Sequence, residues 1–277
     1  MLISKSLEFL NTKLVYYDSC EGEKVIFVTH ANGYSGSCYL YLSRALGFNY
    51  RWIFIDFVGH GLSGSNLNFE NWNFFRDQIL SIIEKENLSK VYGVGHSLGG
   101  ASLSLAAKSR PELFNSLLLL DPTILNSSLL ILGKIVGNPM AETAIKRRRN
   151  FSSREQVRKI FKRFPMFVNW RNDIFEDYIS SCFQDNEEGV SLSCSPEMEA
   201  RVFSSVPILF PFKYRGLRVK SIVVIPRKSN VCSLRAAKKL IGNTEYSKVK
   251  VLDDATHFFP FENPDCVIDE LRVILDG

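Results

Sequence analysis

The sequence predicts an α/β fold in which a mostly parallel, doubly wound sheet is interrupted by a helical insertion. Short apolar runs rich in β-branched residues alternate with longer segments whose apolar residues recur at helical spacing. Such runs are typical of strands that are buried on both faces. The alternation stops after Pro122 and resumes at about residue 219. A segment of different character therefore separates two parts of one sheet.

The alternating elements can be placed along the chain. Strands are expected at residues 14–17, 24–30, 51–57, 90–95, 115–122, 219–226 and 248–254. Helices are expected at residues 37–46, 70–86, 98–109, 234–241 and 264–275. Phe74, Ile79 and Ile82 share one face of the second of these helices. Strands that alternate with helices in this way pair in parallel through crossover connections.

The predicted core comprises residues 1–122 and 219–277, and residues 123–218 are expected to form a helical cap. A basic run spans residues 146–163, with aromatic and aliphatic residues interleaved. The favoured interpretation is a solvated cap helix with an apolar underside, and attraction of anionic substrates or phospholipid surfaces is the alternative. The cap aromatics could form its own core or line an acyl pocket, and they are Phe164, Phe167, Trp170, Phe175 and Tyr178.

Length and composition indicate a globular protein, and the cysteine spacing does not indicate a metal site. The chain has 277 residues, of which 45% are hydrophobic and 23% charged, and its net charge is +5. This mild basicity, without a recognised binding module, does not predict a nucleic-acid partner. The N-terminus lacks the apolar stretch of a signal peptide, and no run is long enough to cross a membrane. None of the 6 cysteines has CxxC spacing, so reduced thiols in the cytoplasm are expected.

The stretch VYGVGHSLGG, residues 91–100, carries the strongest chemical signal. Gly95, Ser97 and Gly99 form a GxSxG pattern between a predicted strand and a predicted helix. A serine in such a tight turn needs small residues two positions away, and the turn lifts its hydroxyl above the sheet. We interpret Ser97 as a nucleophile, with the Leu98 N–H at the helix N-terminus as an oxyanion donor. The alternative is a plain helix N-cap.

A serine nucleophile needs a base. His257 follows the last predicted strand and therefore reaches the same edge of the sheet as Ser97. His96 would point away from the serine hydroxyl in a sharp turn. We therefore predict His257 as the base. The other histidines of the chain are His30 and His60.

The third element is a carboxylate that orients the imidazole. The loop after residue 226 reads RKSN and holds no acid, whereas Asp121 follows the strand next after the serine. Asp121 is therefore the predicted acid. Asp253 and Asp254 are the rivals, but they lie close to His257 in sequence and need a favourable loop geometry.

A second oxyanion donor is expected from the loop after the strand at residues 24–30. Ala31, Asn32 and Gly33 are small or turn-prone, which lets a backbone N–H face the site. We predict that this donor is the N–H of Asn32.

Together these residues resemble the α/β-hydrolase family. The resemblance implies a mostly parallel core, a cap, and hydrolysis through a covalent intermediate without a cofactor. It places the nucleophile at Ser97, the base at His257 and the oxyanion donors at Leu98 and Asn32. The matching motifs are HANG (30–33), DFVGHGLSG (56–64), GHSLGG (95–100), LLLLDP (117–122) and ATHFFPFENP (255–264).

The usual acid position of this family falls near Ser229, which is not acidic. In part of the family the acid follows the sixth strand instead, and Asp121 matches that place. The segment 123–218 also resembles the cap of one subgroup of these hydrolases, and that subgroup carries the HANG motif found here at residues 30–33.

The resemblance implies a carboxylesterase that acts on an apolar small ester. The alternatives are a C–C bond hydrolase or acyltransferase of the same fold, or a ligand receptor without turnover. Epoxide hydrolase and dehalogenase activities are disfavoured because position 97 is Ser and not Asp. The sequence leaves the oligomeric state open, and a membrane surface is not an expected partner.

Overall fold

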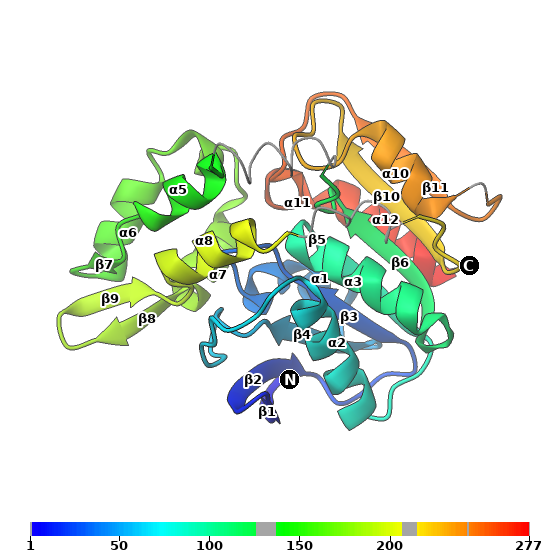
Figure 1. Cartoon of the computed structure of the whole chain (residues 1–277), viewed down its shortest axis with the longest axis horizontal. Helices are drawn as coiled ribbons and strands as arrows, with labels where there is room; N and C mark the ends of the chain where they lie inside the picture. The colour runs from blue at the N-terminus through cyan, green and yellow to red at the C-terminus, as the bar shows by residue number, and fades with distance from the viewer. Residues whose placement is uncertain (1, 126–136, 207–214, 243, 277) are drawn as a thin grey trace.

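The computed structural model describes residues 2–125, 137–206, 215–242 and 244–276. Its core is an 8-stranded sheet in the order β1-β2-β4-β3-β5-β6-β10-β11 (Figure 1). β2 runs antiparallel to both of its neighbours, and the strands from β4 to β11 pair in parallel. The strands are β1 (Ile3–Phe9), β2 (Thr12–Asp18), β3 (Val25–Thr29), β4 (Arg51–Asp56), β5 (Val91–His96), β6 (Phe114–Leu120), β10 (Lys220–Pro226) and β11 (Lys248–Leu252).

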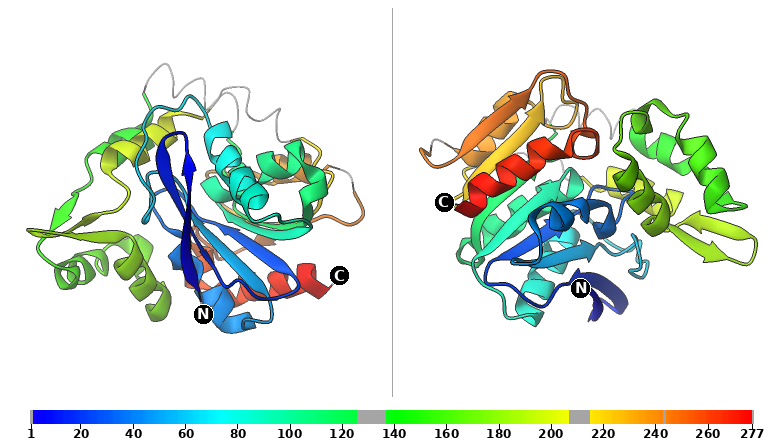
Figure 2. Two further views of the ribbon diagram at one scale, coloured as in Figure 1. Left: turned by 90° about the horizontal axis from the view of Figure 1, so that it is seen from below. Right: turned by 180° about the vertical axis from the view of Figure 1, so that it is seen from behind.

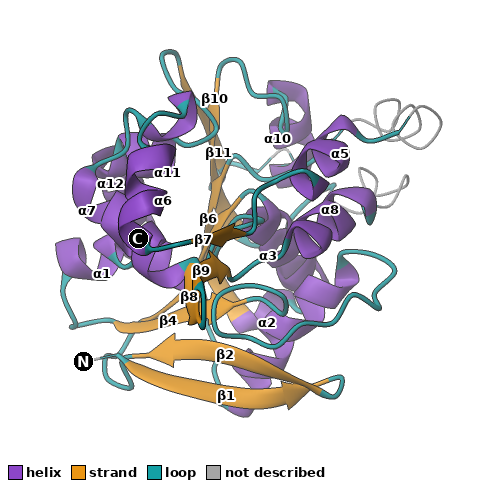
Figure 3. Cartoon of the chain, turned by 90° about the vertical axis from the view of Figure 1, so that its left-hand side faces the viewer, coloured by secondary structure: helices purple, strands orange, loops and turns teal. Residues whose placement is uncertain are grey.

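Helices cover both faces of this sheet (Figure 3). Along β4, Trp52 and Phe54 enter the core on one face, and Ile53 and Ile55 enter the core on the other. Period-two alternation of apolar residues thus buries the strand on both sides. One face packs against α2 (Asn73–Lys85), α3 (Leu98–Ser109) and α10 (Leu234–Ile241), and the other against α1 (Tyr41–Leu46), α11 (Phe259–Glu262) and α12 (Pro264–Asp276).

The segment between β6 and β10 stands beside the core (Figures 1 and 2). It contains helices, as the expectation of a helical cap has it, and also a 3-stranded sheet that this expectation does not include. Its two ends, residues 126–136 and 207–214, lie outside the described residues. The elements are α5 (Pro139–Ile145), β7 (Asn150–Phe151), α6 (Arg154–Phe161), α7 (Asn172–Ser181), β8 (Phe183–Asn186), β9 (Gly189–Leu192) and α8 (Pro196–Ser204).

Local sequence explains the small sheet. Val190 and Leu192 are buried on β9 with an intermediate residue between them, and Phe183 of β8 pairs with Leu192. Gly189 has φ +139°, a conformation that suits glycine, where the chain re-enters the sheet after the β8–β9 turn. This apolar alternation covers few residues and lies within a basic, aromatic stretch, so the sequence alone does not predict these strands.

The basic run does not form one long helix. Phe151 lies on β7, and α6 begins at Arg154 with Val157 and Phe161 as its buried face. Arg158 pairs with Glu155 and Glu176 on the surface. Neighbouring carboxylates therefore neutralise part of the positive charge.

Hydrogen bonds join this segment to loops at the carboxyl edge of the core sheet. The Ser35 hydroxyl donates to Ser181 Oγ at 2.8 Å, and the Arg171 N–H donates to the Phe261 carbonyl at 3.0 Å. At the first of these contacts the Sγ atoms of Cys38 and Cys182 lie 3.5 Å apart, both buried. Cap and core therefore share a packed boundary.

Two further elements differ from expectation. The region 37–46 is divided into a 3-10 helix (Gly36–Tyr39) and α1. β1 was not predicted, because its residues are half-exposed and its apolar pattern is weak. None of the described helices is long and apolar enough to cross a membrane.

A cluster of charged residues fixes the antiparallel edge of the sheet. The carboxylate of Asp18 is fully buried and accepts hydrogen bonds from Arg51 and Lys5, both at 2.7 Å. Glu86 completes the cluster by pairing with both cations. Burial alone would raise the pKa of Asp18, but the bonds from Arg51 and Lys5 outweigh it and hold that pKa below its ordinary value.

We expect Asp18→Asn to lower the free energy of unfolding by about 3 kcal/mol at pH 7, because it leaves two cations with one carboxylate. Folding lowers the pKa of the Asp18 carboxyl below its unfolded value of about 3.8. The ionised carboxyl therefore stabilises the fold fully above that pH, and this contribution is lost as the pH falls below it. The difference between variant and wild type should thus be constant above about pH 5 and shrink below about pH 4. Urea unfolding at several pH values measures it.

Asp253→Asn is the matched control for this prediction. Asp253 is 67% exposed and pairs with Arg227 on the surface, so its loss should change stability by less than about 1 kcal/mol. An Asp18→Asn difference that persists unchanged to pH 2 would contradict the assignment.

Candidate active site

The turn between β5 and α3 places Ser97 in a strained conformation, with φ 54° and ψ −115°. Close packing explains the glycines on either side. A Cβ on Gly95 would lie 2.7 Å from Gly100 Cα, and a Cβ on Gly99 would lie 2.7 Å from the carbonyl oxygen of His30. Both contacts are to backbone, which cannot move aside. The GxSxG spacing is therefore a steric requirement of this turn.

The structure brings Ser97, His257 and Asp121 together at the carboxyl edge of the sheet. His257 Nε2 lies 3.0 Å from Ser97 Oγ, and His257 Nδ1 lies 2.7 Å from Asp121 Oδ2. Because a carboxylate only accepts hydrogen bonds, Nδ1 carries the proton and Nε2 can accept from the serine hydroxyl. Asp121 is fully buried, and the His257 side chain is 28% exposed. This is the geometry of a nucleophile, a base and an orienting acid.

Two residues that sequence reasoning missed complete this arrangement. The Ser229 hydroxyl donates to Asp121 Oδ1 at 2.7 Å, so both carboxylate oxygens of Asp121 have a partner. Thr123 Oγ1 lies 3.1 Å from Ser97 Oγ. The sequence did contain a signal for Ser229. The RKSN loop has no acid at the position that is usual for this family, and Ser229 stands there, where its hydroxyl can bond to the acid that follows the neighbouring strand.

The structure does not bring the rival acids to His257. The carboxylate of Asp253 turns to Arg227, and Asp254 is exposed. Among the described residues, the carboxylate that bonds to the His257 ring is that of Asp121.

The other three histidines are buried and make different contacts. His30 Nε2 accepts from the Phe57 N–H at 2.9 Å, and His60 Nε2 lies 3.1 Å from Asn32 Oδ1. His96 bonds through its two ring nitrogens to Tyr39 and to the carbonyl of His257, away from the serine hydroxyl. Burial lowers the pKa of each ring, that of His60 to about 4, so these imidazoles are neutral.

The loop after β3 lies against the start of α3, and the two predicted oxyanion donors come from these two elements, Asn32 from the loop and Leu98 from the helix. The side chain of Asn32 is held on two sides, by His60 and by the backbone carbonyl of Glu199, to which it donates at 3.1 Å. Neither the Asn32 nor the Leu98 N–H has a hydrogen-bond acceptor within the described part of the chain. Glu199 in turn pairs with Arg147.

Aromatic side chains connect the cap to this loop and to the turn that carries His257. Tyr34 lies 5.9 Å from Trp170 and 5.5 Å from Tyr178, measured between ring centroids. The Trp170 ring lies 4.3 Å from that of Phe261. Phe164, also considered for an acyl pocket, is exposed. The other four aromatic residues considered for that pocket are buried, and they are Phe167, Trp170, Phe175 and Tyr178.

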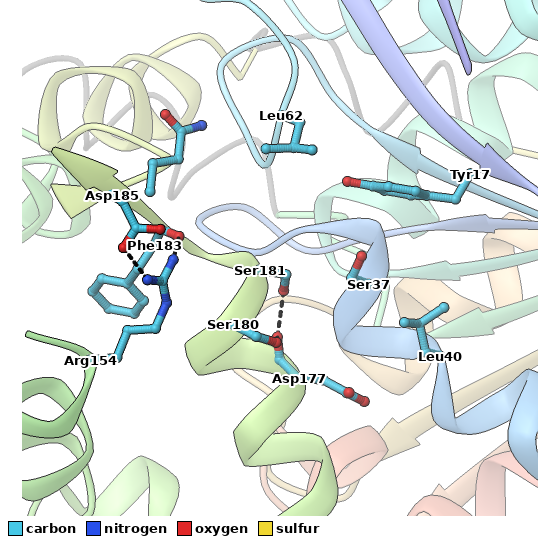
Figure 4. A pocket seen from close by; sticks show the side chains of 11 residues that line it. Tyr17, Ser37, Leu40, Leu62, Arg154, Asp177, Ser180, Ser181, Phe183 and Asp185 are labelled. Carbon is cyan, nitrogen blue, oxygen red and sulfur yellow. Dashed lines mark hydrogen bonds and ion pairs between the residues drawn. The ribbon is translucent and has the colours of Figure 1, made fainter. Parts of the chain in front are cut away.

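A separate cavity of about 450 Å³ opens between core and cap on the side of β2 (Figure 4). Tyr17 and Ser37 line it from the core, and Arg154, Asp177 and Ser181 line it from the cap. The described lining does not include Ser97, Asp121 or His257. In the ranges described by the structure, no group of three or more His, Cys, Asp or Glu side chains is arranged to hold a metal ion.

Fold and site together define a hydrolase of the α/β class. The chain belongs to the alpha/beta hydrolase family, whose pattern it matches over residues 25–270. It is similar to an Escherichia coli 2-hydroxy-6-oxononadienedioate/2-hydroxy-6-oxononatrienedioate hydrolase, with 20% identity over 92% of this chain and 88% of that protein.

Solved structures share the fold. E-2-(acetamidomethylene)succinate hydrolase superposes with a TM-score of 0.82 and 20% identity, covering 100% of both chains. The thioesterase domain from the curacin biosynthetic pathway gives a TM-score of 0.75 and 16% identity, covering 98% of this chain and 99% of that domain. These likenesses confirm the predicted α/β-hydrolase fold.

We expect Gly99→Ala to lower the free energy of unfolding by about 2 kcal/mol, because the new methyl group meets the backbone at the end of β3. Gly64→Ala is the control, since the nearest atoms to its Cβ, the Thr12 hydroxyl at 3.2 Å and the Lys13 nitrogen at 3.3 Å, lie farther away than the backbone atoms at Gly99. Denaturant unfolding measures both. Equal stability of the two variants would show that the turn tolerates a side chain at Gly99.

Proposed function

We propose that this protein is a serine hydrolase that forms an acyl-enzyme on Ser97. The observation that carries the proposal is the hydrogen-bonded series from Ser97 Oγ to His257 at 3.0 Å and on to Asp121 at 2.7 Å. A helix N-cap has no need of a histidine at its hydroxyl, and Ser97 makes no side-chain cap hydrogen bond to α3.

In the proposed reaction His257 Nε2 takes the proton of Ser97 as Oγ attacks the substrate carbonyl. The N–H groups of Leu98 and Asn32 stabilise the oxyanion. His257 then protonates the leaving group and activates water for deacylation. Asp121 holds the imidazole in the tautomer that this sequence of steps requires, and Ser229 holds Asp121.

For the substrate we propose an apolar small ester, which makes the protein a carboxylesterase. The buried aromatic residues between cap and core support an apolar acyl group next to the turn that carries His257. We further propose that residues 1–122 and 219–277 act as the catalytic core, with 123–218 as the cap, that the chain belongs to the HANG subgroup, and that it works in the cytoplasm.

A second candidate is hydrolysis of a C–C bond next to a carbonyl. The similarity to the Escherichia coli 2-hydroxy-6-oxononadienedioate/2-hydroxy-6-oxononatrienedioate hydrolase favours it, since that protein covers 92% of this chain. Turnover on a matched panel of esters and β-diketones separates the two candidates: preference for diketones would overturn the ester assignment.

A fluorophosphonate probe with mass mapping of the adduct tests the nucleophile. We expect the wild type to be labelled at Ser97 and the Ser97→Ala variant not to be labelled, because only an activated serine attacks the phosphorus. Hydrolysis of a chromogenic short-chain ester should fall by about 10⁴-fold or more in the variant. A Ser97→Ala protein that turns over at the wild-type rate would refute the proposal.

The acid is tested by comparing Asp121→Asn with Asp253→Asn and Asp254→Asn. Loss of the carboxylate at 121 destabilises the required tautomer of His257, so kcat should fall by about 10⁴-fold. The other two variants should retain wild-type turnover, because Asp253 bonds to Arg227 and Asp254 is exposed. Loss of activity only at 253 or 254 would reverse the assignment.

A further inference from the structure

His96, the last residue of β5, connects two of the loops that form the site. Its ring is fully buried. His96 Nδ1 lies 2.7 Å from Tyr39 Oη, and His96 Nε2 lies 3.0 Å from the backbone carbonyl of His257. The same Tyr39 oxygen accepts from the Ala31 N–H at 3.3 Å. We call the chain Ala31–Tyr39–His96–His257 the His96 bridge.

The proton positions of the His96 bridge follow from its two ends. The carbonyl of His257 can only accept, so His96 Nε2 carries the hydrogen. A neutral imidazole then offers a lone pair at Nδ1, which accepts the Tyr39 O–H. The Ala31 N–H donates to the tyrosine oxygen, and every polar group of the bridge is paired.

Burial keeps both rings of the bridge uncharged. It lowers the pKa of His96 well below its ordinary value, an effect that the neighbouring His257 increases, and it raises the pKa of Tyr39. The His96 and His257 ring centroids lie 4.9 Å apart. A charged His96 would repel the imidazolium that forms on His257 during the reaction, whereas the neutral ring does not.

The turn that carries His257 makes several hydrogen bonds. Some run within it, from the Phe258 N–H to Thr256 Oγ1 and from Thr256 to Glu262, and the Phe261 carbonyl accepts from the Arg171 N–H of the cap. The bond from His96 instead ties the His257 backbone to the end of β5, one residue before Ser97. It thereby fixes the base relative to the nucleophile.

We propose that His96 is a positioning residue that holds the catalytic turn of His257 and, through Tyr39, the oxyanion loop at Ala31 in register with Ser97. This inference rests on the proposed serine hydrolase function. It assigns no contact with substrate to His96. If His96 only fills space in the core, an apolar residue of similar size should serve as well.

Two amide variants separate positioning from packing. In His96→Gln the side-chain amide reaches the place of Nε2 and can still donate to the His257 carbonyl, whereas the shorter amide of His96→Asn cannot. The rate of fluorophosphonate labelling at Ser97 should stay within about tenfold of the wild type in the Gln variant, which keeps the bond to His257 but offers Tyr39 no acceptor at the place of Nδ1. It should fall by about 100-fold in the Asn and Leu variants, as for a misplacement of about 1 Å.

Steady-state kinetics on an ester give a second readout. The Asn variant should lose kcat with KM changed less than about twofold, since His96 acts on the base and not on the substrate. Tyr39→Phe should lower the labelling rate by about tenfold, and the double variant Tyr39→Phe/His96→Gln should label no more slowly than His96→Gln, because the Gln variant already lacks the bond to Tyr39. Tyr92→Phe, at the opposite end of β5, is the matched control and should label at the wild-type rate.

The outcomes are distinguishable. A wild type that is not labelled overturns the proposed function and this inference with it. A labelled wild type with equal rates in the Gln and Asn variants, or with full activity in the Leu variant, overturns the inference alone. If the Leu variant does not fold, the labelling rates of His96→Gln, His96→Asn and Tyr39→Phe test the inference without it.

Discussion

The strained turn at Ser97 is the constraint on which the site depends, and the neighbouring strand helps to hold it. The Ser97 N–H donates to the Leu120 carbonyl, and the Ser97 carbonyl accepts from the Thr123 N–H. These bonds tie the turn to Leu120, the last residue of β6, and to Thr123, two residues after Asp121. The two residues at the ends of the catalytic series therefore share one backbone anchor.

Asp121 is itself strained, with φ 40°, and its N–H donates to the Val224 carbonyl of β10. A buried carboxylate is costly unless its oxygens are paired. Here His257 pairs one oxygen and Ser229 pairs the other, and Ser229 comes from the loop after β10, where the acid of most such hydrolases resides. Placing the acid after β6 thus requires a small hydroxyl in the usual place, because a second carboxylate there would face Asp121 with like charge.

Sequence reasoning reached the strand–helix alternation and the grouping of Ser97, Asp121 and His257 because both follow from short-range rules. Strands buried on both faces are visibly apolar, and parallel strands present their carboxyl ends at one edge. The roles of Thr123 and Tyr39 could not be predicted, because each hydroxyl finds its partner only when segments distant in the sequence come together. The β8–β9 hairpin escaped because its apolar alternation spans few residues, and β1 because its residues are half-exposed.

The cap is bonded to the same loops that form the catalytic site. Asn32 shows this most directly, because its side chain is held between His60 of the core and the Glu199 carbonyl of the cap. The turn of His257 is linked in the same way, through Phe261, which accepts a hydrogen bond from Arg171 of the cap. The segment between β6 and β10 is therefore hydrogen-bonded both to the loop of Asn32 and to the turn of His257.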